Sequence, residues 1–131
     1  TAIGIVPPIL NFKVINSIVT GYHDDEVVWT SPKNDEVCNF SFDHCVLRTE
    51  KMNTEDSLKF TNTIYENLKD TTQFGEKHFR LFDTDNLKYD FRLRKESAAI
   101  GVADAATSFP TDRRGVLRDD KPDAGCYEFD E

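Results

Sequence analysis

Two histidines are the first candidates for chemistry, because imidazole can act as a general acid, a general base or a metal ligand near neutral pH. His23 precedes the acidic residues 24–26, a run that is typical of a solvated turn. His44 occupies a position that Asn fills in two similar segments, which favours a role at a backbone bend. Neither histidine lies in a recognisable nucleophile motif with Ser or Cys. We therefore assign no catalytic residue from the sequence, and enzymatic activity stays an open question.

An acidic cluster at 83–86, followed by Asp90, supplies oxygen atoms of the kind that bind calcium. The EF-hand pattern is absent, because the sixth position lacks Gly and the twelfth lacks Glu. Asx turns, in which these side chains accept backbone hydrogen bonds, explain the cluster more simply. We therefore expect no metal ion and no other cofactor.

The cysteines Cys38, Cys45 and Cys126 are odd in number, so they cannot all form disulfides within one chain. No Cys-x-x-Cys spacing occurs, which argues against a thiolate zinc site. We interpret the three residues as buried thiols that act as small apolar side chains.

Composition restricts the partners of the protein. The chain has 131 residues, a net charge of −8, 38% hydrophobic and 31% charged residues, values that are typical of one globular domain. The acidic balance argues against nucleic acid, because no basic stripe is present to displace counterions from phosphates. No apolar run reaches the ~20 residues that a membrane span needs. We expect neither nucleic acid nor a membrane as a partner.

The elements that would position these residues follow from a repeated template of alternating apolar residues. Its copies are Phe-Lys-Val-Ile-Asn-Ser-Ile at 12–18, Phe-Ser-Phe-Asp-His-Cys-Val at 40–46 and Leu-Lys-Phe-Thr-Asn-Thr-Ile at 58–64. A fourth alternating run covers 87–94. Imperfect repeats of this length, with short strands and unequal loops, are typical of a solenoid.

In a β-solenoid, each coil lies parallel on the coil below, so Asn16, His44 and Asn62 would form one column at a bend between strands. Asn is suited to such a bend because it tolerates the left-handed backbone conformation. An antiparallel β-sandwich is the alternative fold, since it also has many short alternating strands. A sandwich gives no reason for separate segments to share one template, so the sequence favours the solenoid.

Four C-terminal motifs follow in order: Tyr89-Asp90-Phe91-Arg92-Leu93, Glu96-Ser97-Ala98-Ala99-Ile100-Gly101, Asp112-Arg113-Arg114-Gly115 and Pro122-Asp123-Ala124-Gly125-Cys126-Tyr127-Glu128. This order resembles the closing segment of secreted bacterial right-handed parallel β-helix proteins of the pectate-lyase-like superfamily. The resemblance covers about residues 89–129, and it departs from the usual Pro, Ile and Ala at Ala99, Ala124 and Cys126.

The resemblance implies an all-β fold, a right-handed parallel β-helix of about four coils with a C-terminal cap. Its coils would occupy residues 1–94, and the terminal coil and cap would occupy residues 95–131. It also implies a secreted, periplasmic or cell-surface location. Because only one cap is recognisable, we expect that the chain is a fragment and that upstream coils, or a second subunit, cover the N-terminal end.

The resemblance further implies a role with polysaccharides. We expect a non-catalytic coil-and-cap region that contacts glycans; a polysaccharide lyase or glycoside-active enzyme, and a protein-docking or adhesin-like module, are the alternatives. Lyases of this architecture use basic residues to neutralise a uronate, although outward basic residues on a strand also simply keep a surface soluble. The candidate substrate-binding residues are Tyr22, Trp29, Arg92 and Arg94.

Overall fold

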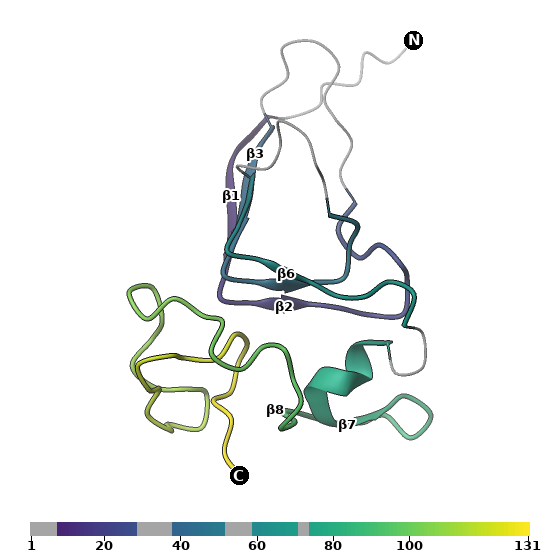
Figure 1. Cartoon of the computed structure of the whole chain (residues 1–131), viewed down its shortest axis with the longest axis vertical. Helices are drawn as coiled ribbons and strands as arrows, with labels where there is room; N and C mark the ends of the chain where they lie inside the picture. Colours follow the sequence, from purple (N-terminus) through teal and green to yellow (C-terminus); the bar gives the residue numbers. More distant parts are fainter. Residues whose placement is uncertain (1–7, 29–37, 52–58, 71–73) are drawn as a thin grey trace.

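The computed structural model describes residues 8–28, 38–51, 59–70 and 74–131. Two small parallel sheets, an antiparallel hairpin, a short 3-10 helix and an irregular C-terminal segment make up this part of the chain (Figure 1). The elements are β1 (Ile9–Ile15), β2 (Ile18–Val19), β3 (Cys38–Asp43), β4 (Val46–Leu47), β5 (Phe60–Thr61), β6 (Ile64–Tyr65), η2 (Phe74–His78), β7 (Phe79–Asp83) and β8 (Lys88–Leu93).

The two parallel sheets have the strand orders β1-β3-β5 and β2-β4-β6. Template positions pair with template positions: Phe42 with Phe60 in the first sheet, and Val46 with both Ile18 and Ile64 in the second. The in-register stacking predicted from the repeat is therefore confirmed for these segments.

The bend between the two sheets is left-handed at each level. Asn16, His44 and Asn62 have φ angles of 50°, 52° and 49°. Backbone hydrogen bonds run between the levels at this corner, from Asn16 N–H to the Asp43 carbonyl and from His44 N–H to the Thr61 carbonyl. The shared polar position of the template is thus explained by a backbone conformation that most side chains avoid.

We predict that His44→Val lowers the free energy of unfolding by about 1–2 kcal/mol, because a β-branched residue is strained in the left-handed region. His44→Asn serves as the matched control, since Asn adopts this conformation at the equivalent bends. Urea denaturation followed by circular dichroism measures both variants. Equal stabilities of the two variants would contradict the assignment of the bend.

The predicted four-coil right-handed parallel β-helix is wrong. The described residues form small separate sheets of three, three and two strands, with both parallel and antiparallel pairing, and they do not close into a solenoid. The run 87–94, which we expected to continue the coils, contains β8 and pairs antiparallel with β7. The physical reason is the turn between them, where the Asp83 carboxylate accepts the Asn86 N–H and Leu87 adopts a φ of 53°.

Two apolar clusters lie on opposite faces of the β2-β4-β6 sheet. Leu47 belongs to the cluster between the two parallel sheets, with Phe42, Cys45 and the half-buried Phe60. Val46 belongs to the other cluster, formed with the hairpin and the C-terminal segment; its further members are Leu93, Ala99, Ala124, Ile18, Phe79, Val102 and Phe129. Both faces of β4 are therefore covered, and the hairpin is held against the sheet.

Buried carboxylates hold the irregular C-terminal segment together. Asp112 accepts the N–H groups of Arg114, Val116 and Glu128 at 2.7, 3.0 and 3.1 Å. Asp123 accepts those of Gly101 and Phe129 at 2.7 and 2.6 Å, and the Glu128 carboxylate accepts a hydrogen bond from Arg118 at 2.7 Å. The segment has one isolated strand bridge, between Thr111 and Leu117. Elsewhere in it, these side-chain bonds satisfy backbone N–H groups that strand pairing would otherwise satisfy.

The interpretation of the cysteines holds only in part. All three thiols are free, with Cys45 buried and Cys38 half-buried. Cys126 is exposed, so its interpretation as a buried thiol is wrong.

Candidate functional site

A buried polar cluster joins the parallel strands to the rest of the molecule. Thr20, Arg48 and Glu66 follow β2, β4 and β6 at equivalent positions, as the backbone bonds Arg48 N–H to Val19 and Glu66 N–H to Leu47 show. The Glu66 carboxylate accepts hydrogen bonds from Thr20 Oγ1 at 2.7 Å, Arg48 Nη1 at 3.1 Å and His78 Nε2 at 2.6 Å. His78 Nδ1 lies 3.0 Å from Ser97 Oγ. One cluster thus ties the sheet, the hairpin and the C-terminal segment together.

The charge of Glu66 is stabilised inside this cluster. Burial alone would raise the pKa of the Glu66 carboxyl, but hydrogen bonds from His78, Thr20 and Arg48 outweigh burial and lower the pKa below its ordinary value. Arg48 and His78 are fully buried and both bond Glu66; Arg48 also donates to the His23 carbonyl at 2.8 Å and lies 3.6 Å from the Asp24 carboxylate. The cluster is accordingly ionic rather than neutral.

Ser97, His78 and Glu66 form a chain of hydrogen bonds like that of a serine hydrolase. A nucleophile must reach a substrate, yet Ser97 is only 6% exposed and its Oγ also accepts the Ala99 N–H at 3.2 Å. His78 is 0% exposed. We therefore assign this cluster a structural role.

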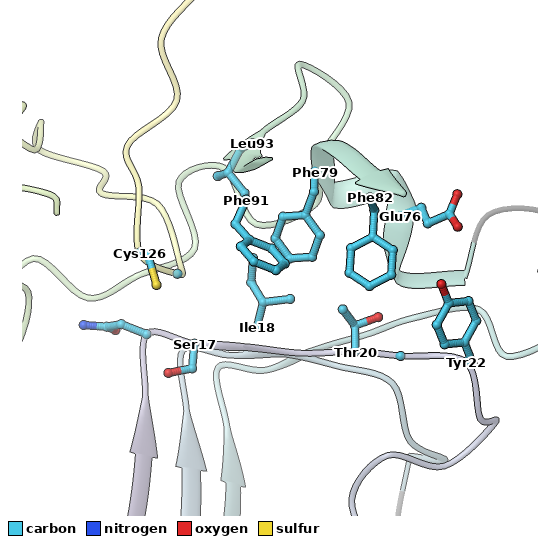
Figure 2. A pocket seen from close by; sticks show the side chains of 13 residues that line it. Ser17, Ile18, Thr20, Tyr22, Glu76, Phe79, Phe82, Phe91, Leu93 and Cys126 are labelled. Carbon is cyan, nitrogen blue, oxygen red and sulfur yellow. The ribbon is translucent and has the colours of Figure 1, made fainter. Parts of the chain in front are cut away.

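A groove of about 480 Å³ lies between the β2 level, the hairpin and the turn at 125–126 (Figure 2). We refer to it as the aromatic groove. Its lining residues are Asn16, Ser17, Ile18, Thr20, Gly21, Tyr22, Glu76, Phe79, Phe82, Phe91, Leu93, Gly125 and Cys126. Gly125, with a φ of 103°, brings the turn to within hydrogen-bond reach of the Asn16 carbonyl, at 2.8 Å.

Aromatic rings form the hairpin side of the aromatic groove. Phe79 and Phe91 meet edge to face at a centroid distance of 5.2 Å, and Tyr22 reaches across from the β2 level to lie 6.0 Å from Phe82. Tyr89 extends the cluster beyond the groove and stacks on Phe91 at 5.7 Å. Tyr22, Tyr89 and Phe91 remain 43%, 42% and 44% exposed, so rings are presented to solvent rather than enclosed.

Most polar groups of the aromatic groove already have partners. The Asn16 amide donates to Thr107 and Ser108 at 3.0 and 3.1 Å, and the Ser17 hydroxyl donates to the Ile15 carbonyl at 2.6 Å. The Thr20 hydroxyl donates to Glu66, as described above. These bonds shape the groove, and they leave the aromatic faces as its main contact surface.

The structure separates the residues that the sequence suggested for substrate binding. Tyr22 lines the aromatic groove. Arg92 bonds the Asp90 carboxylate through Nε at 2.9 Å, and Arg94 lines a different, shallower depression with Arg80 and Glu96. Trp29 lies outside the described residues. The two arginines therefore do not share a site with Tyr22.

Sequence reasoning missed Glu76 and the role of the hairpin phenylalanines. Phe79 packs against the apolar cluster of Val46 and also lines the groove, whereas Phe91 lines the groove and is 44% exposed. The alternation of Phe91 with charged residues marks one face of a strand. The pairing of β7 with β8 places Phe79 opposite Leu93 and Phe82 opposite Tyr89, and therefore on that same face. Glu76 carries no sequence signal that distinguishes it from other surface acids.

The acidic cluster at 83–86 is part of the hairpin turn. Asp83 uses both carboxylate oxygens on Asn86, accepting its backbone N–H at 3.0 Å and its side-chain amide at 2.9 Å. Over the described ranges, no group of three or more His, Cys, Asp or Glu side chains is arranged to hold a metal ion. No helix within the same ranges is long and apolar enough to cross a membrane.

Comparisons with protein-family models, with curated proteins and with solved structures find no match. The resemblance of residues 89–129 to pectate-lyase-like proteins therefore stays a prediction.

Proposed function

We propose that the protein is a non-catalytic carbohydrate-binding module and that the aromatic groove is its binding site. The observation that supports this function is the set of exposed rings, Tyr22 and Phe91 above all, around a cavity of about 480 Å³. Sugar rings have an apolar C–H face that packs on aromatic rings, and ligand sites of this kind are mostly apolar with few polar groups.

The described lining of the groove argues for binding rather than catalysis. It includes one carboxylate, Glu76, and no Lys, Arg or His. A glycosidase needs two carboxyl groups across the scissile bond, and β-elimination from a uronate needs a base together with a countercharge for the carboxylate. The extracytoplasmic location that the C-terminal resemblance implies would bring the groove into contact with extracellular or cell-wall glycans.

We predict that Tyr22→Ala weakens oligosaccharide binding about tenfold, a loss of about 1.4 kcal/mol that matches one aromatic stacking contact. Isothermal titration calorimetry with a panel of neutral, acidic and amino-sugar oligosaccharides measures the affinity. Phe109→Ala is the matched control, because Phe109 is an aromatic residue that is 83% exposed and does not line the groove.

Two results would overturn the proposed function. One is the absence of binding to every oligosaccharide by the folded wild-type protein. The other is binding that Tyr22→Ala and Phe109→Ala affect equally, because the sugar would then lie elsewhere.

A further inference from the structure

Among the described residues that line the aromatic groove, Glu76 is the one with a charged side chain. It lies on η2, and its carboxylate has no hydrogen bond or ion pair with another residue in the described part of the chain. Figure 2 shows Glu76 and Tyr22 at the same end of the groove, with Phe82 beside them. A negative charge next to aromatic rings is an arrangement that attracts cations, through both Coulomb attraction and cation–π contacts.

Three cations that neighbour groove residues in the sequence, Lys77, Arg80 and Arg92, are engaged elsewhere, and Arg94 lines the separate depression. Lys77 Nζ lies 3.9 Å from Glu66 Oε2 in the buried cluster. Arg80 bonds Asp130, Arg92 bonds Asp90, and neither arginine is among the lining residues of the groove. Glu76 therefore keeps its charge available to a ligand, and the net charge of −8 adds to the negative potential around it.

We infer that the aromatic groove selects an amino sugar, a hexosamine whose ammonium group pairs with Glu76 while the sugar ring packs on Tyr22. This inference rests on the proposed carbohydrate-binding function and names its ligand class. A uronate would place a second negative charge beside Glu76 and is disfavoured. A neutral sugar keeps the packing on Tyr22 but gains no charge pairing.

The test compares oligosaccharides of one length that differ in charge: glucosamine, N-acetylglucosamine and galacturonate oligomers. Calorimetry is done at low salt and mildly acidic pH, where a sugar amine is protonated. We expect the glucosamine oligomer to bind the wild-type protein about tenfold more tightly than the N-acetylated one, about 1.4 kcal/mol. We expect the galacturonate oligomer to bind most weakly.

Glu76→Gln is expected to remove the preference for the glucosamine oligomer and to leave the affinity for the N-acetylated oligomer unchanged. Glu50→Gln is the matched control, because it makes the same chemical and net-charge change at an exposed residue outside the groove. This control separates a local effect of Glu76 from a general attraction of a cationic sugar to an acidic protein.

The outcomes distinguish the inference from the function on which it rests. Binding without preference, a stronger affinity for galacturonate, or equal effects of Glu76→Gln and Glu50→Gln would overturn the inference while the carbohydrate-binding function stands. No binding of any oligomer by the folded protein would overturn both.

Discussion

Glu66→Ala is expected to lower the free energy of unfolding by about 3–5 kcal/mol, because it removes the carboxylate that pairs with the buried Arg48 guanidinium and bonds the buried His78 ring. Arg48 and His78 are both fully buried, and each bonds the Glu66 carboxylate. Without that carboxylate, Arg48 loses a buried anionic partner and His78 loses its Nε2 hydrogen bond, while the bonds of Arg48 to the His23 carbonyl and of His78 to Ser97 remain. Urea denaturation at neutral pH, followed by circular dichroism, measures the loss. Glu50→Ala, at an exposed position, should change stability by less than about 0.5 kcal/mol.

The pH dependence of stability tests the same cluster without deleting packing. The pKa of Glu66 in the folded protein lies below its ordinary value of 4.5. Its contribution to stability is therefore complete above the unfolded pKa and is lost as the pH falls through the folded pKa. The wild-type protein should lose stability below about pH 4.5 more steeply than Glu66→Gln, which has no carboxyl to titrate.

Asp123 has the opposite tendency, because burial raises the pKa of its carboxyl. That contribution is present in the wild-type protein and in Glu66→Gln alike, so the difference between their pH profiles isolates Glu66. Parallel profiles, or a loss in Glu66→Ala no larger than that in Glu50→Ala, would show that the cluster does not hold the elements together.

The second large effect is expected from Phe42→Ala, with a loss of about 3–5 kcal/mol in the free energy of unfolding. Phe42 is 6% exposed and stacks on Phe60 at a centroid distance of 5.4 Å, with the rings nearly parallel. It also packs against Cys45 and Leu47 between the two parallel sheets. Truncation leaves a cavity at the corner where the sheets meet. Chemical denaturation with intrinsic fluorescence measures the change.

Phe109→Ala is the control for Phe42→Ala, because it deletes the same atoms from a ring that is 83% exposed. It should change stability by less than about 0.5 kcal/mol. Similar losses for the two variants would mean that Phe42 does not lie in a packed cluster, and the assignment of the inner apolar face would be wrong.

The pairing of the parallel strands could be predicted from the sequence because it depends on local and repeated features. Alternating apolar residues define the strands, and like residues stack when strands lie parallel and in register. The bend residues Asn16, His44 and Asn62 mark the left-handed positions, which few residue types tolerate. These features are visible in one sequence without any knowledge of the fold.

The fold as a whole could not be predicted in the same way. The alternation in 87–94 is equally compatible with a further parallel coil and with an antiparallel hairpin, and the turn beginning at Asp83 decides between them. The C-terminal segment is organised by carboxylates such as Asp112 and Asp123, whose bonds to backbone N–H groups have no periodicity. The prediction therefore extended the parallel repeat to segments of the chain that do not share it.

The candidate site was only partly accessible to sequence reasoning for a related reason. Tyr22 was selected as an exposed ring that could contact a sugar, and it does line the aromatic groove. Its neighbours Phe82 and Glu76 lie more than fifty residues further along the chain, and the fold that brings them together is not the predicted one. Arg92 was selected for its charge, but Asp90 engages that charge.

A residue-resolved NMR titration of the isotope-labelled full chain with a glucosamine oligosaccharide most directly tests whether the aromatic groove binds sugar. We predict that the resonances of Tyr22, Glu76 and Phe82 shift together with one dissociation constant, while those of Arg94 and Phe109 stay unchanged. Shifts at Arg94 or Phe109 without shifts in the groove, or no shifts in a folded sample, would contradict the assignment of this groove as the binding site.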